Sequence, residues 1–280
     1  MSETLLIVDG YDRLGRAKLA EAGCTLAGTL YENMIRRFLP DAAITILHPA
    51  DADESLPSGT NLSAYDAALW TGSSLTIYHD TPEVTRQVDL ARAVYEAGVP
   101  SFGSCWALQV ATLAAGGTCR LNPNGREFGI SRKITLTDAG RDHPLYAGRP
   151  VVFDAFTSHF DDVEALPPGA LLLAGNRISP VQAAVIEKNG TPFWAVQYHP
   201  EYDLAEVAAL TRFRMDGLVE EGRFADHTAA HAFVADLEAL HADPARIDIA
   251  WRLGIDRDVM DPDLRTLEVK NWIENVLRSA

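Results

Sequence analysis

Short apolar segments alternate with segments of helical periodicity along the first half of the chain, and this alternation restricts its fold more than any other feature. Residues 5–8 are apolar and partly β-branched and are followed by Gly10, as expected for a buried strand that ends in a turn. Further strands are expected over residues 43–47, 66–70 and 99–102. The alternation predicts a doubly wound α/β fold, with a mainly parallel sheet flanked by helices. Because ligands bind at the carboxyl ends of the strands in such folds, we expect the site in the loops after Trp70 and Phe102.

Helices are expected between these strands. The apolar residues of segment 29–39, among them Leu30 and Met34, recur at helical spacing. Another helix is expected to begin after Thr81, whose side chain can cap it, with Pro82 in the first turn.

The second half of the chain changes character twice. Segments 117–137 and 151–196 are rich in expected strands and in turns that contain Pro and Gly. Helices are then expected near residues 204–221, 224–242 and 262–278. We therefore divide the chain into an α/β domain, residues 1–205, and a helical C-terminal extension, residues 206–280. The extension is apolar enough to pack on the domain or at an interface; it could cover the domain, form a lid over the site or make a homodimer interface.

Bulk composition excludes several classes of function. The formal charge is −15, and the 24 Lys and Arg residues are scattered, which argues against a nucleic-acid partner. The start of the chain has no basic segment of a signal peptide, and no apolar run approaches the roughly 20 residues of a membrane span. We therefore expect a cytoplasmic protein without membrane contact. The three cysteines lack metal-ligand spacing, which argues against a disulfide framework and a zinc site and leaves a thiol free for chemistry.

Cys105 is the candidate nucleophile. It directly follows the expected strand and precedes a run of helical character that ends at Gly116. A strand-to-helix turn lifts a side chain clear of the sheet, and the helix N-terminus favours the thiolate. Cys24 and Cys119 have no such context and are expected to be core residues.

His199 and Glu201 are the candidate base and its orienting carboxylate. A cysteine hydrolase needs an imidazole within hydrogen-bond reach and an acceptor that fixes its tautomer. In an extended segment residues two apart face the same side, and Pro200 stiffens the link, so the Glu201 carboxylate can approach the ring. The seven other histidines are expected to be surface or structural residues.

These residues resemble two motifs of the class I glutamine amidotransferase family, Gly-x-Cys-x-Gly-x-Gln and a His-Pro-Glu after a later strand. The residues that match the first motif are Gly103, Cys105 and Gln109. Ala107 stands in place of its second glycine, which adds one methyl group to a tight turn. The second motif is intact at residues 199–201. The resemblance covers roughly residues 5 to 205, and the pair of motifs is far more specific than either motif alone.

The resemblance also implies an oxyanion hole. Residues 71–74, Thr-Gly-Ser-Ser, occupy the place of a Gly-Gly-Pro-like loop in the family. By this resemblance Gly72 and the N–H groups of Ser73 and Trp106 stabilise the developing oxyanion. Ser73 replaces the second glycine of the family's loop.

Two further segments resemble the family and imply a substrate site. Residues 125–129 are similar to its Gly-x-Glu-x-Gly segment, and residues 158–167 are similar to the Ser-His-Gly-Asp-x-Val segment of the GMP synthetase glutaminase domain. The resemblance implies that Gln109, Ser158 and Phe160 hold the α-amino and carboxylate groups of a γ-glutamyl substrate. Phe160 replaces a glycine of the family, which bears on the identity of the substrate more than on the chemistry.

The expected function is therefore cysteine-dependent hydrolysis of glutamine or another γ-glutamyl amide through a glutamyl thioester, without a metal or an organic cofactor. One alternative is a glutaminase subunit that delivers ammonia to a separate synthetase partner. A second alternative, from another class, is a non-catalytic binding or regulatory protein on the same fold. The intact Cys105, His199 and Glu201 argue against the second alternative.

Overall fold

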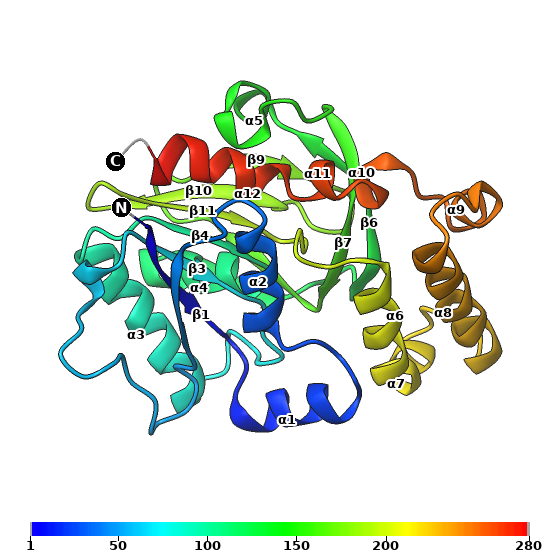
Figure 1. Cartoon of the computed structure of the whole chain (residues 1–280), viewed down its shortest axis with the longest axis horizontal. Coiled ribbons are helices and arrows are strands. Elements are labelled where there is room, and N and C mark those ends of the chain that lie inside the picture. The colour runs from blue at the N-terminus through cyan, green and yellow to red at the C-terminus, as the bar shows by residue number, and fades with distance from the viewer. Residues whose placement is uncertain (1, 279–280) are drawn as a thin grey trace.

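A nine-stranded sheet forms the centre of the molecule in the computed structural model, which describes residues 2–278 (Figure 1). Its strand order is β2-β1-β3-β4-β11-β10-β9-β6-β7, and β5 and β8 form a separate two-stranded sheet. The strands are β1 (Thr4–Val8), β2 (Ala43–Leu47), β3 (Ala67–Trp70), β4 (Ser101–Ser104), β5 (Thr118–Leu121), β6 (Glu127–Leu136), β7 (Val152–His159), β8 (Asp161–Ala165), β9 (Leu171–Gly175), β10 (Ala183–Lys188) and β11 (Thr191–Val196).

The sheet has a parallel half and an antiparallel half. Strands β2, β1, β3, β4 and β11 pair in parallel, as the alternation of strands and helices predicts. Strands β10, β9, β6 and β7 continue the sheet in antiparallel pairs and come from the strand-rich middle of the chain. The predicted doubly wound α/β fold is confirmed, and the carboxyl ends of β3, β4 and β11 lie side by side.

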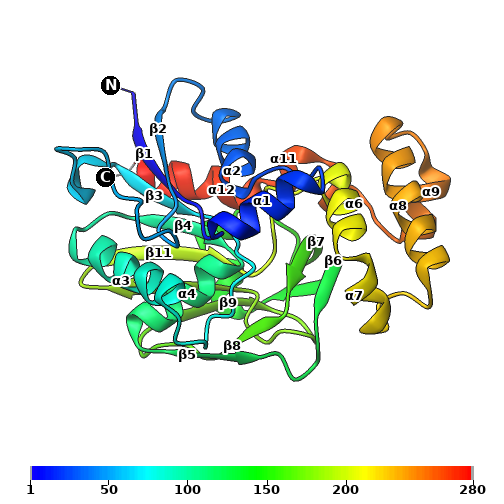
Figure 2. The ribbon, with the colours of Figure 1, turned by 90° about the horizontal axis from the view of Figure 1, so that it is seen from below.

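Side chains of β1 alternate between two cores, because successive residues of a strand point to opposite faces. Leu5 and Ile7 pack with residues of α2 (Ala27–Arg36) and α12 (Leu267–Trp272). Leu6 and Val8 pack with residues of α3 (Pro82–Glu96) and α4 (Trp106–Ala115). The sheet is therefore the middle of three layers, with α3 and α4 on one face and α2 and α12 on the other (Figure 2).

The observed helices agree with most of the expected segments. The remaining helices are α1 (Arg13–Glu21), α5 (Asp138–Asp142), α6 (Leu204–Phe213), α7 (Met215–Glu220), α8 (His227–Ala242), α9 (Ile247–Leu253), α10 (Arg257–Met260) and α11 (Pro262–Arg265), with 3-10 turns at Leu62–Ala64 and Pro144–Tyr146 and a π turn at Ile273–Leu277. Thr81 is the N-cap residue of α3 and Pro82 lies in its first turn, but the Thr81 side chain makes no capping hydrogen bond, so the predicted side-chain cap is wrong.

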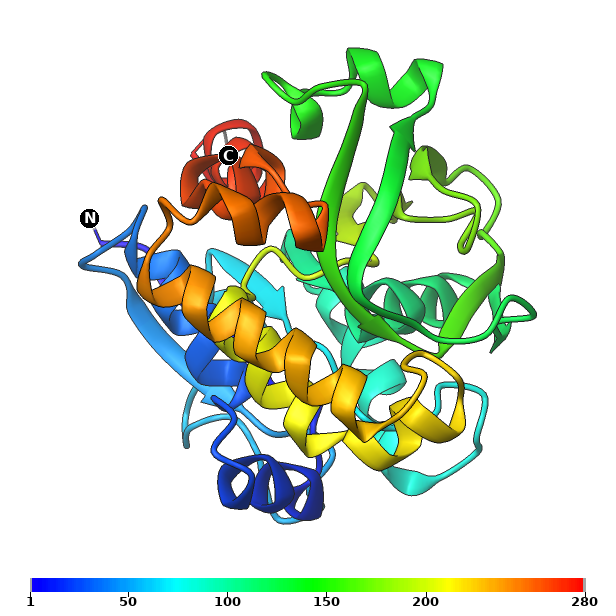
Figure 3. The ribbon, with the colours of Figure 1, turned by 90° about the vertical axis from the view of Figure 1, so that its right-hand side faces the viewer.

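The C-terminal extension contacts the rest of the molecule at several places, among them β7, against which α10 packs. Helices α6 to α9 form a group at one edge, where α8 lies along α6 (Figure 3). Helix α12 instead lies on the sheet, where Glu268 forms a buried ion pair with Arg149 at 3.0 Å and accepts a hydrogen bond from the Tyr198 hydroxyl at 2.8 Å. The proposed division after residue 205 stays a prediction. Among the described helices none is long and apolar enough to cross a membrane.

Candidate active site

Cys105 occupies a strained turn between β4 and α4. Its φ is 55° and its ψ is −101°, a conformation that non-glycine residues rarely adopt. The turn is held by a hydrogen bond from the Cys105 N–H to the Val196 carbonyl on β11, at 2.8 Å. Strain of this kind persists only where the surrounding structure enforces it, and it is concentrated at functional sites. The geometry presents the predicted nucleophile at the carboxyl end of the sheet.

The small residues around this turn explain how Ala107 can stand where the family motif has its second glycine. A Cβ atom on Gly103 would lie 2.3 Å from the Ala107 Cβ and 2.6 Å from the Trp70 carbonyl oxygen. The Ala107 methyl group therefore occupies space that glycine at position 103 leaves open, and the turn keeps its shape.

His199 and Glu201 follow β11 and form a buried pair. The His199 Nδ1 and Glu201 Oε1 atoms are 2.6 Å apart, and each side chain is 2% exposed. The imidazole stacks on the Tyr202 ring with centroids 4.0 Å apart, while its Nε2 is buried and makes no hydrogen bond of ordinary geometry in the described chain. Burial lowers the pKa of His199, but Glu201 and Cys105 raise it more, to about 10. Cys105 lies close enough to affect the pKa of His199, and the Nε2 atom has no other partner among the described residues. The imidazole is therefore available to the Cys105 thiol.

A residue of α2 also supports this pair, and no sequence motif indicated it. The Ser104 hydroxyl lies 3.1 and 3.2 Å from the two Glu201 carboxylate oxygens, and the Tyr31 hydroxyl donates to Ser104 Oγ at 2.6 Å. The chain of hydrogen bonds restrains the carboxylate that faces His199. Ser104 precedes the nucleophile directly, but no local pattern indicates Tyr31.

The loop after β3 lies against His199. A Cβ atom on Gly72 would be 3.0 Å from His199 Cε1, so a larger residue would displace the imidazole. The Ser73 hydroxyl donates to the Gly10 carbonyl at 2.8 Å and accepts from the Leu75 N–H at 3.1 Å, which holds the loop against the end of β1. Trp106 is the first residue of α4, where main-chain N–H groups lack partners within the helix. The structure thus places Gly72, Ser73 and Trp106 around Cys105, and their role in an oxyanion hole stays a prediction.

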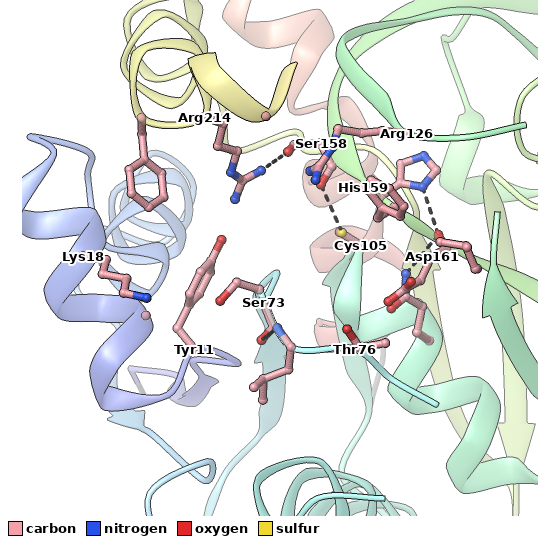
Figure 4. A pocket seen from close by; sticks show the side chains of 18 of the residues that line it. Tyr11, Lys18, Ser73, Thr76, Cys105, Arg126, Ser158, His159, Asp161 and Arg214 are labelled. Carbon is pink, nitrogen blue, oxygen red and sulfur yellow. Dashed lines mark hydrogen bonds between the residues drawn. The ribbon is translucent and has the colours of Figure 1, made fainter. Parts of the chain in front are cut away.

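A cavity of about 720 Å³ opens above Cys105 (Figure 4). The three predicted substrate residues, Gln109, Ser158 and Phe160, all line it. The Ser158 carbonyl oxygen is 3.8 Å from the Cys105 sulfur, and Gln109 Nε2 is 3.4 Å from the Asp161 carbonyl oxygen. The structure brings these residues together with the nucleophile, as a single substrate site requires.

His159 has a structural role, as expected. Its Nε2 pairs with Glu127 at 2.9 Å, and its Nδ1 lies 3.0 Å from the Asp161 carbonyl oxygen. The Glu127 carboxylate also accepts from Gln182 at 2.8 Å. These contacts hold the segment that carries Ser158 and Phe160.

The other cysteines lack the surroundings of Cys105. Burial raises the pKa of Cys24 to about 11 and raises the pKa of Cys119 as well, so both thiols stay protonated at neutral pH. Within residues 2–278, no group of three or more His, Cys, Asp or Glu side chains could hold a metal ion.

Two cavity residues were not expected from sequence. Tyr11 lies just beyond β1, and Arg214 lies between α6 and α7. The Tyr11 hydroxyl points toward the Arg214 guanidinium (Figure 4). No motif indicates either residue, since their proximity arises only when the extension folds over the end of the sheet.

The family of this chain follows from comparison with known proteins. The family model described as "Glutamine amidotransferase class-I" matches residues 32–213. The chain belongs to this family. It is therefore an amidohydrolase of the class I glutamine amidotransferase type, as the two motifs predict. It is 32% identical to the "Gamma-glutamyl-L-1-hydroxyisopropylamide hydrolase" of a Pseudomonas species, over 98% of this chain and 92% of that protein.

The GMP synthases among the relatives are larger proteins, of which this chain covers only a part. The chain is 32% identical to the glutamine-hydrolysing GMP synthase of Nitrosomonas eutropha, over 68% of this chain but only 36% of that protein. Among solved structures, glutamine amidotransferases of Thermotoga maritima and Methylobacillus flagellatus share the fold, with TM-scores of 0.63 and 0.64. Both structures are 15% identical to this chain in sequence, and both match 99% of it. The match covers 99% of the Thermotoga maritima protein and 96% of the Methylobacillus flagellatus protein.

Proposed function

We propose that the protein hydrolyses γ-glutamyl amides with a catalytic triad of Cys105, His199 and Glu201. The observation that carries the proposal is the arrangement around the Cys105 turn. The thiol lies in a strained strand-to-helix turn at the base of a cavity, beside a buried imidazole whose Nδ1 is 2.6 Å from a carboxylate. A thiol, a base and an orienting carboxylate in this order form the arrangement needed for acyl transfer.

The reaction proceeds in two halves. His199 holds the proton of the Cys105 thiol, and the thiolate attacks the γ-carbonyl carbon to form a C–S bond. The oxyanion accepts hydrogen bonds from the N–H groups of Ser73 and Trp106. His199 then protonates the departing nitrogen, the C–N bond breaks, and a glutamyl thioester remains. In the second half, water gives a proton to His199 as it attacks the thioester carbon, the C–S bond breaks, glutamate is released, and the sulfur takes the proton back from His199.

Glu201 supports both halves of the reaction. Its carboxylate accepts the Nδ1–H of His199, which directs Nε2 to the thiol and stabilises the imidazolium. Ser104 and Tyr31 in turn hold the carboxylate in place. Because the Glu201 side chain is only 2% exposed, water competes little for these interactions.

A free-standing hydrolase is better supported than a subunit of a synthetase. The match to the γ-glutamyl-amide hydrolase of Pseudomonas spans nearly both chains, whereas the GMP synthase of Nitrosomonas eutropha is matched over 36% of its length. We therefore propose a γ-glutamyl amide of a small amine as the substrate, and the cytoplasm as the compartment. No synthetase partner is required in this proposal.

A hydrolysis screen of the isolated protein tests the proposal. Glutamine, γ-glutamyl alkylamides and γ-glutamyl peptides are compared by the glutamate that each releases. We expect release from at least one γ-glutamyl alkylamide without added protein. Labelling with a diazo-oxo-norleucine, followed by mass spectrometry, is expected to modify Cys105. Labelling only in the presence of cell extract would favour a partner-dependent subunit, and preferential labelling of Cys24 or Cys119 would refute the site.

A further inference from the structure

We propose that Arg214 binds the α-carboxylate of the γ-glutamyl substrate and so determines which acyl groups the enzyme accepts; this inference rests on the proposed function. Arg214 comes from the C-terminal extension, at the junction of α6 and α7. Its guanidinium points into the cavity above Cys105 (Figure 4).

The guanidinium is held by neutral groups rather than by a carboxylate. It donates to Ser158 Oγ, and the Tyr11 hydroxyl points toward it (Figure 4). Burial raises the pKa of Tyr11 to about 12, so that hydroxyl is uncharged at neutral pH. Arg214 forms no ion pair with any described residue, whereas Arg212, two residues earlier and exposed, pairs with Glu238. A partly buried cation without a protein counter-ion gains more electrostatic energy from an anionic ligand than a cation that is already paired with a carboxylate.

Arg214 and the nucleophile both contact Ser158, from opposite ends of that residue. Ser158 lies between the two: its carbonyl oxygen is 3.8 Å from the Cys105 sulfur, and its hydroxyl accepts from Arg214. In a γ-glutamyl amide, four carbon–carbon bonds of about 1.5 Å each separate the reacting carbonyl carbon from the α-carboxylate carbon. A glutamyl chain bound along Ser158 can therefore reach both groups.

The other cations of the cavity are less suited to this role. Arg126 already pairs with Glu221 at 2.8 Å and stacks over the Phe160 ring at 4.5 Å. Lys18 is exposed on α1, where its ammonium is hydrated. Arg214 is the cation that combines partial burial, proximity to the nucleophile and freedom from an acidic partner. Its planar fork also fits a carboxylate through two parallel hydrogen bonds.

Substrate analogues that differ only in the α-carboxylate test the inference. L-γ-glutamyl ethylamide and 4-aminobutanoyl ethylamide have the same leaving amine, and the second lacks only the carboxylate. We expect Arg214→Met to raise KM for the glutamyl amide about 30-fold or more, with a smaller change in kcat, because a buried charge partner is lost. The same variant is expected to change kcat/KM for the 4-aminobutanoyl amide less than about 3-fold, since that substrate makes no such contact.

Further variants separate binding from structure. Arg214→Lys keeps the charge without the fork and is expected to give an intermediate KM. Arg212→Met, at an exposed position in the last turn of α6, is the control and is expected to behave as the wild type. As a readout independent of turnover, calorimetric titration of the Cys105→Ala protein with L-glutamate is expected to show binding that Arg214→Met removes.

Three outcomes would overturn the inference and leave the hydrolase proposal intact. The first is an equal loss on both ethylamides, which would indicate a structural role for Arg214. The second is a wild-type kcat/KM for the glutamyl amide that exceeds the value for the 4-aminobutanoyl amide by less than about 3-fold. The third is an effect of Arg214→Met on γ-glutamylglycine but not on γ-glutamyl ethylamide, which would place a carboxylate of the leaving amine at Arg214. If the wild type hydrolyses no γ-glutamyl amide and Cys105 is not labelled, the proposed function fails and the inference fails with it.

Discussion

Replacement of Glu201 by glutamine separates the charge of the orienting residue from its shape. The substitution keeps a side chain of equal length beside His199 and removes only the negative charge. In the native site this charge lies 2.6 Å from Nδ1, and both side chains are 2% exposed. The charge therefore acts with little screening from solvent.

The pKa of His199 sets the size of the expected effect. One pKa unit corresponds to about 1.4 kcal/mol, so the net rise from 6.5 to about 10 corresponds to about 5 kcal/mol, which Glu201 and Cys105 supply in excess of the opposing effect of burial. We assign about 2–3 kcal/mol of this to the charge-assisted hydrogen bond of Glu201. Glu201→Gln is then expected to lower kcat roughly 30- to 150-fold. His199→Ala removes the base itself and is expected to cost about 10³- to 10⁴-fold.

The pH profile gives a second readout with a definite sign. Glu201 raises the pKa of His199, so loss of its charge lowers that pKa. Since imidazolium must protonate the leaving amine, the alkaline limb of kcat/KM is expected to move to lower pH, by about two pH units. The profile is measured by amine release from a γ-glutamyl alkylamide. An unmoved alkaline limb, or a loss of kcat greater than that of His199→Ala, would refute the assigned roles.

Three further predictions concern the nucleophile, the support of Glu201 and the extension. Cys105→Ala is expected to abolish hydrolysis with the thermal midpoint nearly unchanged, while Cys119→Ser keeps most of the turnover; residual activity within tenfold of the parent would disprove the assignment. Tyr31→Phe removes the hydrogen bond to Ser104 and is expected to lower kcat roughly 3- to 10-fold; an unchanged kcat would show that the hydrogen-bond chain does not contribute to catalysis. Arg149→Met leaves Glu268 buried without its ion-pair partner, so the free energy of unfolding is expected to fall by about 3–5 kcal/mol in urea titrations, and a fall below about 1 kcal/mol would contradict this.

The parts of the fold that sequence predicted are those with strong local patterns. Strand β2 spans the expected residues 43–47, and β4 ends next to the expected turn at Cys105. Both strands are short and bounded by turns; β4 is fully buried in the sheet, whereas β2 is an edge strand of mainly β-branched and apolar residues. Helix α1 was missed for the opposite reason. It has one buried residue, Leu19, and its polar remainder gives no apolar periodicity.

The parts of the site that sequence did not predict depend on contacts between distant segments. The Cys105 turn and the pair of His199 and Glu201 each lie within a few consecutive residues, so motifs reveal them. Tyr31 reaches Ser104 across 73 positions, and Arg214 reaches Ser158 across 56. Neither residue type is unusual at its position, so only the folded structure indicates a role.

The position of Arg214 in the chain suggests how chemistry and acyl selectivity are divided. The family model ends at residue 213, so the residues of the proposed triad lie inside the matched region and Arg214 is the first residue beyond it. Helix α12, further along the extension, is fixed to the sheet through the buried pair of Glu268 and Arg149. Arg214 itself is restrained by its hydrogen bond to the Ser158 hydroxyl on β7. Such restraint keeps a guanidinium in one orientation, as discrimination between carboxylate and methylene requires. On this argument, exchange of the extension between family members would change the accepted acyl group while the triad, and with it the acyl-transfer chemistry, stays the same.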